Sequence, residues 1–209
     1  MHPWKHYVAI GDSFTEGIGD PVDGFQSIGC MERLAQILKK SNPDFQFTNL
    51  AKRGLMISEI RQGQLVQALK LKPDFVSIVA GANDIMKGRF VAQDFENELR
   101  ELYEPTVNSR ALVSSVNIPF FPFIKTLDEP IQKRLNRQIE KANSIFKSLA
   151  DEYKIILMDA NALADAFDEN DWSADKTHLN ARGYFKSTDK IIQTLEQHTG
   201  FEIGRAEMP

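Results

Sequence analysis

The sequence is poor in the features that mark several large classes of protein. It has one cysteine, Cys30, in 209 residues, so no internal disulfide can form, which fits a reducing compartment. No segment approaches the run of roughly 18 apolar residues that a membrane span requires. The N-terminal residues contain no apolar stretch of the kind found in secretory signals. We therefore expect a cytoplasmic protein without a membrane span.

A strong charge of one sign and the usual cofactor motifs are also missing. The 25 basic and 29 acidic residues give a net charge of −4, which argues against a general nucleic-acid binder. No glycine motif that cradles phosphate precedes a helix in the required way, so flavin or nucleotide binding is disfavoured. The acidic stretch from Asp165 to Asp171 lacks regular metal-ligand spacing. We expect neither a metal nor an organic cofactor.

The chain does contain a regular alternation of strand and helix patterns. Short apolar runs predict strands at residues 7–10, 45–50, 75–80, 111–116 and 155–158. Apolar residues at helical spacing predict helices at 28–38, 57–69, 95–103, 130–153 and 181–199, and the glycine-rich segment 14–24 predicts a loop. This alternation indicates an α/β fold with three layers, in which helices cover both faces of a five-stranded parallel sheet.

The length of 209 residues suits one domain spanning 1–209. We expect its core to run from about residue 5 to residue 198, followed by a C-terminal tail from 199 to 209. We find no internal repeat, low-complexity tract or linker that would divide the chain.

Polar residues follow directly on the predicted strand ends. Ser13 comes just after the first strand, and Asn83 comes just after the third. Ligands in open α/β sheets bind outside the carboxyl ends of the strands, so we expect both residues at one rim. A serine nucleophile needs a nearby base, and the motif Asp175-x-x-His178 offers an imidazole with a carboxylate to orient it. Taken singly, each of these residues also fits a turn or a solvated surface position.

Together these segments resemble the blocks of the GDSL, or SGNH, hydrolase family. Gly11-Asp12-Ser13-Phe14 resembles the first block, and Gly54, Gly81-Ala82-Asn83-Asp84 and Asp175-Lys176-Thr177-His178 fall where the other blocks would fall. The resemblance runs from Gly11 to the final helix. It implies a flavodoxin-like fold that hydrolyses esters or thioesters without a cofactor. Phe14 stands where leucine is usual, and Leu179 stands where proline often follows the histidine, which could loosen that loop.

The resemblance also implies a role for each residue. Ser13 would attack the acyl carbonyl, His178 would act as acid and base, and Asp175 would orient the histidine ring. The backbone amides of Ser13 and Gly54 and the side chain of Asn83 would form the oxyanion hole. From their local sequence, Asp12 is expected to hold the turn through backbone amides, and Asp84 to stand at a helix start.

A phenylalanine-rich segment, residues 117–124, follows the fourth predicted strand at the same rim. It could line an acyl pocket or form a lid, or it could be buried against the sheet or contact another subunit. Phe121 and Phe123 from this segment, with Phe14 beside the nucleophile, are our candidate substrate-binding residues.

We therefore expect a serine esterase that cleaves a small or medium acyl ester through an acyl-enzyme intermediate. An O-acetyl carbohydrate deacetylase, a thioesterase and a lysophospholipase are alternatives within the family. A flavodoxin-like binding module is the alternative outside catalysis, and it is disfavoured because binding alone does not need a nucleophile, a base and oxyanion donors together. The expected partner is a small acyl ester, while acyl length, alcohol group and oligomeric state stay open.

Overall fold

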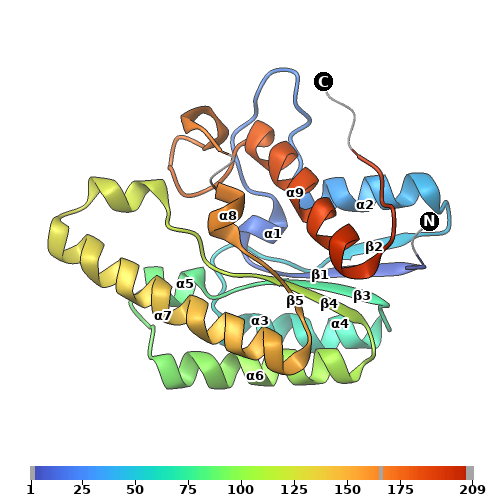
Figure 1. The fold of residues 1–209 in the computed structure, drawn as a ribbon, viewed down its shortest axis with the longest axis horizontal. Helices are drawn as coiled ribbons and strands as arrows, with labels where there is room; N and C mark the ends of the chain where they lie inside the picture. The colour runs from blue at the N-terminus through green and yellow to red at the C-terminus, as the bar shows by residue number, and fades with distance from the viewer. Residues whose placement is uncertain (1–2, 165–166, 206–209) are drawn as a thin grey trace.

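A parallel sheet of five strands forms the centre of the molecule (Figure 1). The computed structural model describes residues 3–164 and 167–205, and its strands lie in the order β2-β1-β3-β4-β5. Every strand falls within one residue of an apolar run predicted from the sequence, and the three-layer α/β fold is confirmed. The strands are β1 (His6–Gly11), β2 (Gln46–Asn49), β3 (Phe75–Val79), β4 (Leu112–Val116) and β5 (Ile156–Met158).

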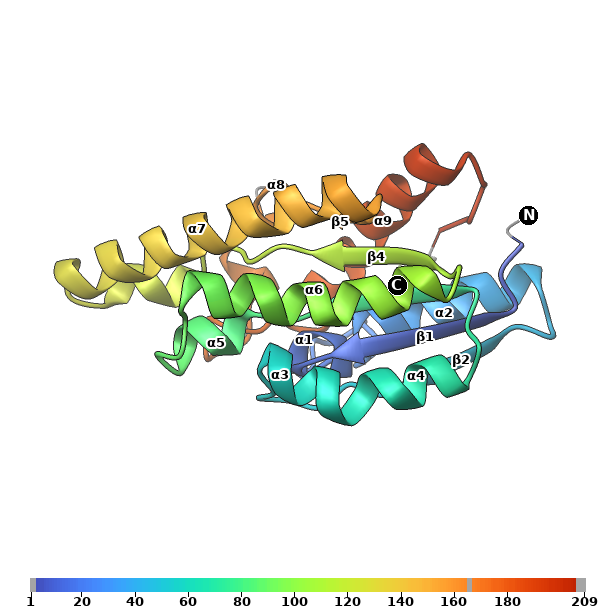
Figure 2. The same cartoon turned by 90° about the horizontal axis from the view of Figure 1, so that it is seen from below.

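Helices cover both faces of this sheet. Figure 1 shows α2 (Cys30–Ser41) and α9 (Ala181–Thr199) on one face. Figure 2 shows the opposite face, where α4 (Val66–Lys70), α6 (Ala92–Asn108) and α7 (Glu129–Tyr153) lie. Alternate residues of β1 enter the two apolar layers, because successive side chains of a strand point to opposite faces.

The predicted helix ends are confirmed where a capping residue marks them. The Asn180 side chain accepts a hydrogen bond from the backbone of Gly183 at 3.0 Å and so begins α9. Gly200 ends the same helix in the left-handed conformation, with φ 72°. Asn42, just before a proline, ends α2.

Two expected elements differ from prediction. The first residues of the predicted loop 14–24 belong to a single helical turn, α1 (Ser13–Glu16). The predicted helix 57–69 consists of α3 (Ile57–Ile60), a π-helical turn η1 (Arg61–Leu65) and α4. The η1 turn matters for the site because the Gln64 side chain is buried there and bonds both the backbone N–H and C=O of Gly11, at 2.7 and 2.9 Å.

Three short helices in the connections were not predicted, because they are too short to show a periodic pattern: η2 (Pro122–Thr126), α8 (Ala160–Ala164) and η3 (Glu169–Asp171). A fourth, α5 (Ala82–Met86), was predicted only as a helix start at Asp84.

The described part of the C-terminal tail packs against the body of the protein. The Phe201 ring lies 5.9 Å from that of Trp4, and Ile203 is buried in the layer beneath α2 and α9. Within residues 3–164 and 167–205, none of the helices combines the length and the apolar composition needed to cross a bilayer.

Candidate active site

The candidate nucleophile sits in a tight turn at the end of β1. The Asp12 side chain accepts a hydrogen bond from the backbone of Phe14 at 3.2 Å and caps α1, and Gly17 ends that helix with φ 85°. Gly11 has φ 153°, and a Cβ added there would lie 2.4 Å from the carbonyl oxygen of Val79. Only glycine allows β1 and β3 to approach at this point. The turn therefore places Ser13 at the rim where the strands end.

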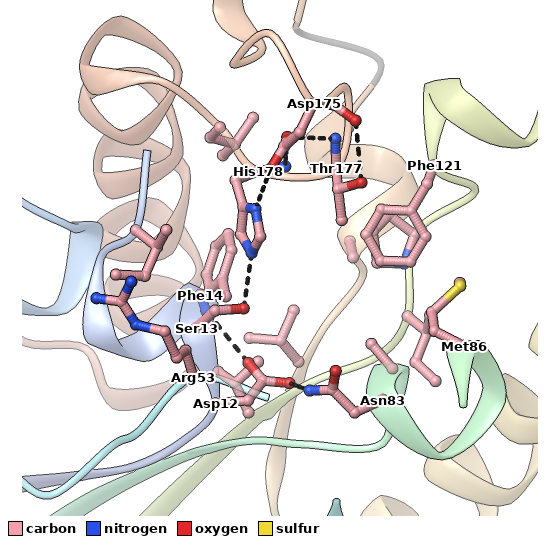
Figure 3. Close-up of a pocket in the computed structure, with 18 of the residues that line it drawn as sticks. Asp12, Ser13, Phe14, Arg53, Asn83, Met86, Phe121, Asp175, Thr177 and His178 are labelled. Atoms are coloured by element: carbon pink, nitrogen blue, oxygen red, sulfur yellow. Dashed lines mark hydrogen bonds and ion pairs between the residues drawn. The ribbon is translucent and has the colours of Figure 1, made fainter. Parts of the chain in front are cut away.

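Ser13, His178 and Asp175 form a continuous chain of hydrogen bonds (Figure 3). His178 Nε2 lies 2.7 Å from Ser13 Oγ, although the two residues are 165 positions apart in the sequence. His178 Nδ1 lies 2.6 Å from Asp175 Oδ2. Because a carboxylate only accepts, the neutral ring carries its proton on Nδ1 and leaves Nε2 free to accept from the serine hydroxyl.

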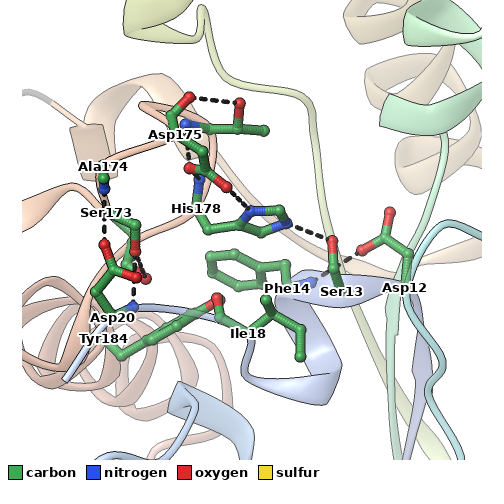
Figure 4. Close-up of polar contacts among 12 residues, drawn as sticks. Asp12, Ser13, Phe14, Ile18, Asp20, Ser173, Ala174, Asp175, His178 and Tyr184 are labelled. Carbon is green, nitrogen blue, oxygen red and sulfur yellow. Dashed lines mark hydrogen bonds and ion pairs between the residues drawn. The ribbon is translucent and has the colours of Figure 1, made fainter.

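The loop that carries this histidine is held by hydrogen bonds on both sides (Figure 4). Inside the loop, the Ser173 backbone N–H donates to the carbonyl of His178 at 2.8 Å. Across the site, Asp20 accepts from the backbone of Ala174 at 2.8 Å and donates its own N–H to Ser173 Oγ at 2.9 Å. Leu179, at the position where proline is usual in the family, is buried in the core at 3% exposure. These contacts restrain the loop without a proline.

Hydrogen bonds favour the ionised form of Asp175. Burial favours its neutral form, but hydrogen bonds from the His178 backbone, the His178 ring and the Thr177 backbone outweigh this and hold the pKa of Asp175 below its usual range. The two backbone donors lie 2.9 Å from Oδ1, which leaves Oδ2 for the ring. Asp175 can therefore keep the ring oriented at any pH near neutrality.

The other two predicted oxyanion residues, Gly54 and Asn83, line the same pocket as Ser13. Gly54 has φ 78°, and a Cβ there would meet no atom within 4 Å, so the backbone conformation rather than crowding requires glycine. Asn83 lies in the first turn of α5, and its Nδ2 donates to Asp12 Oδ2 at 3.1 Å and to the carbonyl of Leu55 at 3.0 Å. Both of its N–H groups thus have acceptors in the free protein.

Two carboxyl groups adjoin the oxyanion residues, that of the buried Asp12 and that of the half-buried Asp84. Burial raises the pKa of Asp12 from 3.8 to about 6, and burial likewise raises the pKa of Asp84 to about 6. Asp84 lies in the first turn of α5, as expected, and its Oδ2 accepts from the backbone of Ile57 at 3.2 Å. The cap on Phe14 confirms the expected turn-holding contact of Asp12, whereas its bond to Asn83 was not predicted.

The pocket beside Ser13 has a volume of about 600 Å³ and a largely apolar wall. The wall contains all three candidate substrate-binding residues, Phe14, Phe121 and Phe123. The Phe121 and Phe123 rings lie 5.9 Å apart, and Phe121 is 8% exposed and belongs to the core beneath the pocket. Phe121 therefore both lines the pocket and belongs to the buried core. Met86 of α5 also lines the pocket.

A comparison with protein families decides the class of the protein. The model of the GDSL-like lipase/acylhydrolase family matches residues 9–185. The chain belongs to the GDSL-like lipase/acylhydrolase family. It is accordingly a carboxylic ester hydrolase of the esterase and lipase type, as the resemblance of the motifs implied.

Solved structures of esterases and lipases share the fold of this GDSL-like hydrolase. TesA is 19% identical, with a TM-score of 0.74 over 92% of this chain and 99% of TesA. A catalytic mutant of Axe2, an acetylxylan esterase from Geobacillus stearothermophilus, is 19% identical, with a TM-score of 0.72 over 97% of both chains. The lipase Lip_vut3 from a goat rumen metagenome is 20% identical, with a TM-score of 0.70 over 91% of this chain and 97% of that one. A comparison with curated protein sequences finds no significant match.

Carboxylates of the acidic stretch near the site form ion pairs with basic side chains of α9. Lys186 Nζ lies 2.6 Å from the fully buried Asp171, and Arg182 lies 2.8 Å from Asp168. Asp165, which belongs to the same stretch, lies outside the described residues. Among the described residues of this GDSL-like hydrolase, no group of three or more His, Cys, Asp or Glu side chains is arranged to hold a metal ion.

Proposed function

We propose that this esterase acts through a covalent acyl-enzyme, with Ser13 as nucleophile, His178 as acid and base, and Asp175 as the group that orients the ring. The observation that carries the proposal is the unbroken Asp175–His178–Ser13 chain, with distances of 2.6 and 2.7 Å. A serine hydroxyl is a weak nucleophile alone, and this contact gives it a base within reach of its proton.

In the first step, Ser13 Oγ attacks the ester carbonyl carbon while its proton passes to His178 Nε2. The carbonyl π electrons move to oxygen and give a tetrahedral oxyanion, and the Asp175 carboxylate stabilises the imidazolium. The backbone N–H groups of Ser13 and Gly54 and the amide of Asn83 are the proposed oxyanion donors. Removal of one such donor typically costs about 10²–10³ in turnover.

In the next step, the imidazolium returns its proton to the alcohol oxygen as the bond from the acyl carbon to that oxygen breaks. The alcohol leaves, and the acyl group stays on Ser13. Water then attacks this acyl-enzyme while His178 removes a proton from the water. As the second tetrahedral intermediate collapses, the imidazolium returns this proton to Ser13 Oγ, and the acid is released.

The substrate is proposed to be a small or medium acyl ester. A pocket of about 600 Å³ whose wall includes Phe121, Phe123 and Met86 provides apolar surface for an acyl chain. Axe2, which shares the fold, is an acetylxylan esterase, so an acetylated sugar is the substrate to compare against longer acyl esters. We keep the cytoplasm as the proposed location, with the single buried Cys30 as support.

A fluorophosphonate probe tests the proposal, because it reacts with an activated serine. We expect it to label Ser13 and to abolish hydrolysis of a series of aryl esters, thioesters and acetylated sugars. Ser13→Ala should lose both labelling and activity. Labelling at another residue, with Ser13→Ala still active, would show that the nucleophile has been assigned wrongly.

A further inference from the structure

The Asp12 carboxyl group lies between the turn that carries Ser13 and the helix that carries Asn83 (Figure 3). Its Oδ1 accepts the backbone N–H of Phe14 at 3.2 Å, and its Oδ2 accepts Asn83 Nδ2 at 3.1 Å. Asp12 is only 3% exposed. One buried carboxyl group therefore joins two elements that stand 71 residues apart in the sequence.

The surroundings of the Asn83 side chain determine which way its amide points. Its nitrogen faces the carboxylate of Asp12 and the backbone carbonyl of Leu55, at 3.1 and 3.0 Å. An ionised carboxylate and a carbonyl can only accept hydrogen bonds. The opposite orientation would bring the amide oxygen against two acceptors and leave it without a donor there. With Leu55 alone, the amide would have one anchor and could rotate away from it.

We propose that Asp12 is a positioning residue: it fixes the orientation of the Asn83 side-chain amide by holding one of its N–H groups beside the turn that carries Ser13. The inference rests on the proposed function, in which Asn83 is an oxyanion donor. An oxyanion bound to Ser13 would share the N–H that Asp12 holds in the free enzyme. A donor that is already oriented needs no reorganisation when the negative charge develops, and this is the source of its effect on rate.

The cap that Asp12 gives to α1 could by itself explain an aspartate at this position, so the test must separate the two contacts. Asp12→Ser keeps a hydroxyl oxygen for the Phe14 N–H but has no second acceptor for Asn83. Asp12→Asn has nearly the same shape and also caps a helix well. If its oxygen caps α1, however, its NH₂ meets the NH₂ of Asn83, and two donors face each other.

We expect both variants to lower kcat by about tenfold or more on an aryl ester, as part of the roughly 10²–10³ that one donor contributes. KM should stay within about twofold, because the contact matters most in the transition state. Asp94→Ser is the matched control, since it removes an exposed carboxyl group from the first turn of α6 and should leave kcat unchanged. A wild-type kcat in Asp12→Asn would mean that Asp12 acts only as a cap. A rise in kcat in Asp12→Ser would mean that it competes with the oxyanion.

A double-mutant cycle shows whether Asp12 acts through Asn83. In the Asn83→Ala background, Asp12→Ser should cost less than about twofold, because the amide it positions is gone. A loss as large as in the wild-type background would overturn the inference while leaving the proposed function intact. If Asn83→Ala alone keeps the wild-type kcat, the oxyanion assignment itself fails, and the inference fails with it. Thermal unfolding of each variant verifies that the comparison is made on folded protein.

Discussion

The nucleophile and its base are held in two different ways. The turn at Gly11–Gly17 is built into the core: it contains the buried residues Asp12 and Thr15, and Gly11 lies against the backbone of β3. The histidine loop at 172–179 lies at the surface, where the Asp175 side chain is 50% exposed. Ser173 and Leu179 at its base are buried, whereas the part that carries Asp175 is held by hydrogen bonds within the loop and to Asp20.

Substitutions in these two segments should therefore have different effects on stability and on catalysis. Substitutions in the nucleophile turn should disturb folding as well as catalysis, because the turn and the sheet share their closest contacts. Substitutions in the histidine loop should disturb catalysis while the free energy of unfolding changes little, because exposed side chains contribute little to stability. Predictions on both segments test this difference, and a last one concerns the pocket wall.

The largest effect is expected from removing the reacting groups. Ser13→Ala and His178→Ala should each lower kcat by about 10⁴ or more, and the double variant should be little worse, because members of a catalytic unit are not additive. Asp175→Asn should cost less than either, since this carboxylate is half exposed and water can partly orient the ring. The measurements are kcat for each variant and its unfolding midpoint. Losses that multiply would count against a triad.

Gly11→Ala should be the most destabilising change in the nucleophile turn. Its Cβ would lie 2.4 Å from the Val79 carbonyl oxygen and 2.6 Å from Thr15 Oγ1, at φ 153°. We expect a loss of roughly 2–4 kcal/mol in the free energy of unfolding, because the backbone of two strands would have to separate. Gly63→Ala is the control, since a Cβ there meets no atom within 4 Å. Equal stability of the two variants in chemical denaturation would contradict the close fit of the turn.

The buried Asp12 should make stability depend on pH. Its pKa is raised by burial from 3.8 to about 6, so the folded protein holds this proton more tightly than the unfolded chain. The associated stability is present below about pH 4 and is lost as the pH rises through about 6, by up to roughly 3 kcal/mol. The effect of Asp12→Ser on unfolding free energy should therefore be more favourable at pH 7 than at pH 4.5. A pH-independent difference would argue against the raised pKa.

The smallest effect concerns the apolar wall of the pocket. Phe121→Ala should lower kcat/KM on long acyl esters more than on short ones. The cost is about 0.8 kcal/mol, or about fourfold, for each methylene that is no longer buried. Phe120→Ala is a suitable control, because that ring is 41% exposed and does not line the pocket. A penalty that is equal at all chain lengths would assign Phe121 to the core alone.

Much of the fold was predictable because its signals are local. Buried parallel strands are short apolar runs, and residues such as Asn180 and Gly200 mark helix ends by their own chemistry. The candidate site residues were predictable because they stand in motifs. The contacts of Asp20 with Ser173 and Ala174, and of Asp12 with Asn83, were not, since they join positions 71 or more residues apart. Nothing in a single segment signals such a pairing.

The π-helical turn η1 has a consequence for the strand that precedes the nucleophile. Gln64 bonds both backbone groups of Gly11, and the backbone N–H of Lys52 also donates to the Gly11 carbonyl at 3.2 Å, so the polar groups at the end of β1 are satisfied. A π turn contains one residue more than an α turn, and deletion of Gly63 would let the helix continue regularly and rotate Gln64 by about 100°. Gly11 would then exchange its amide hydrogen with solvent much faster. The irregular winding of this helix thus holds the end of β1, and the hold depends on the length of the segment as well as on the Gln64 side chain.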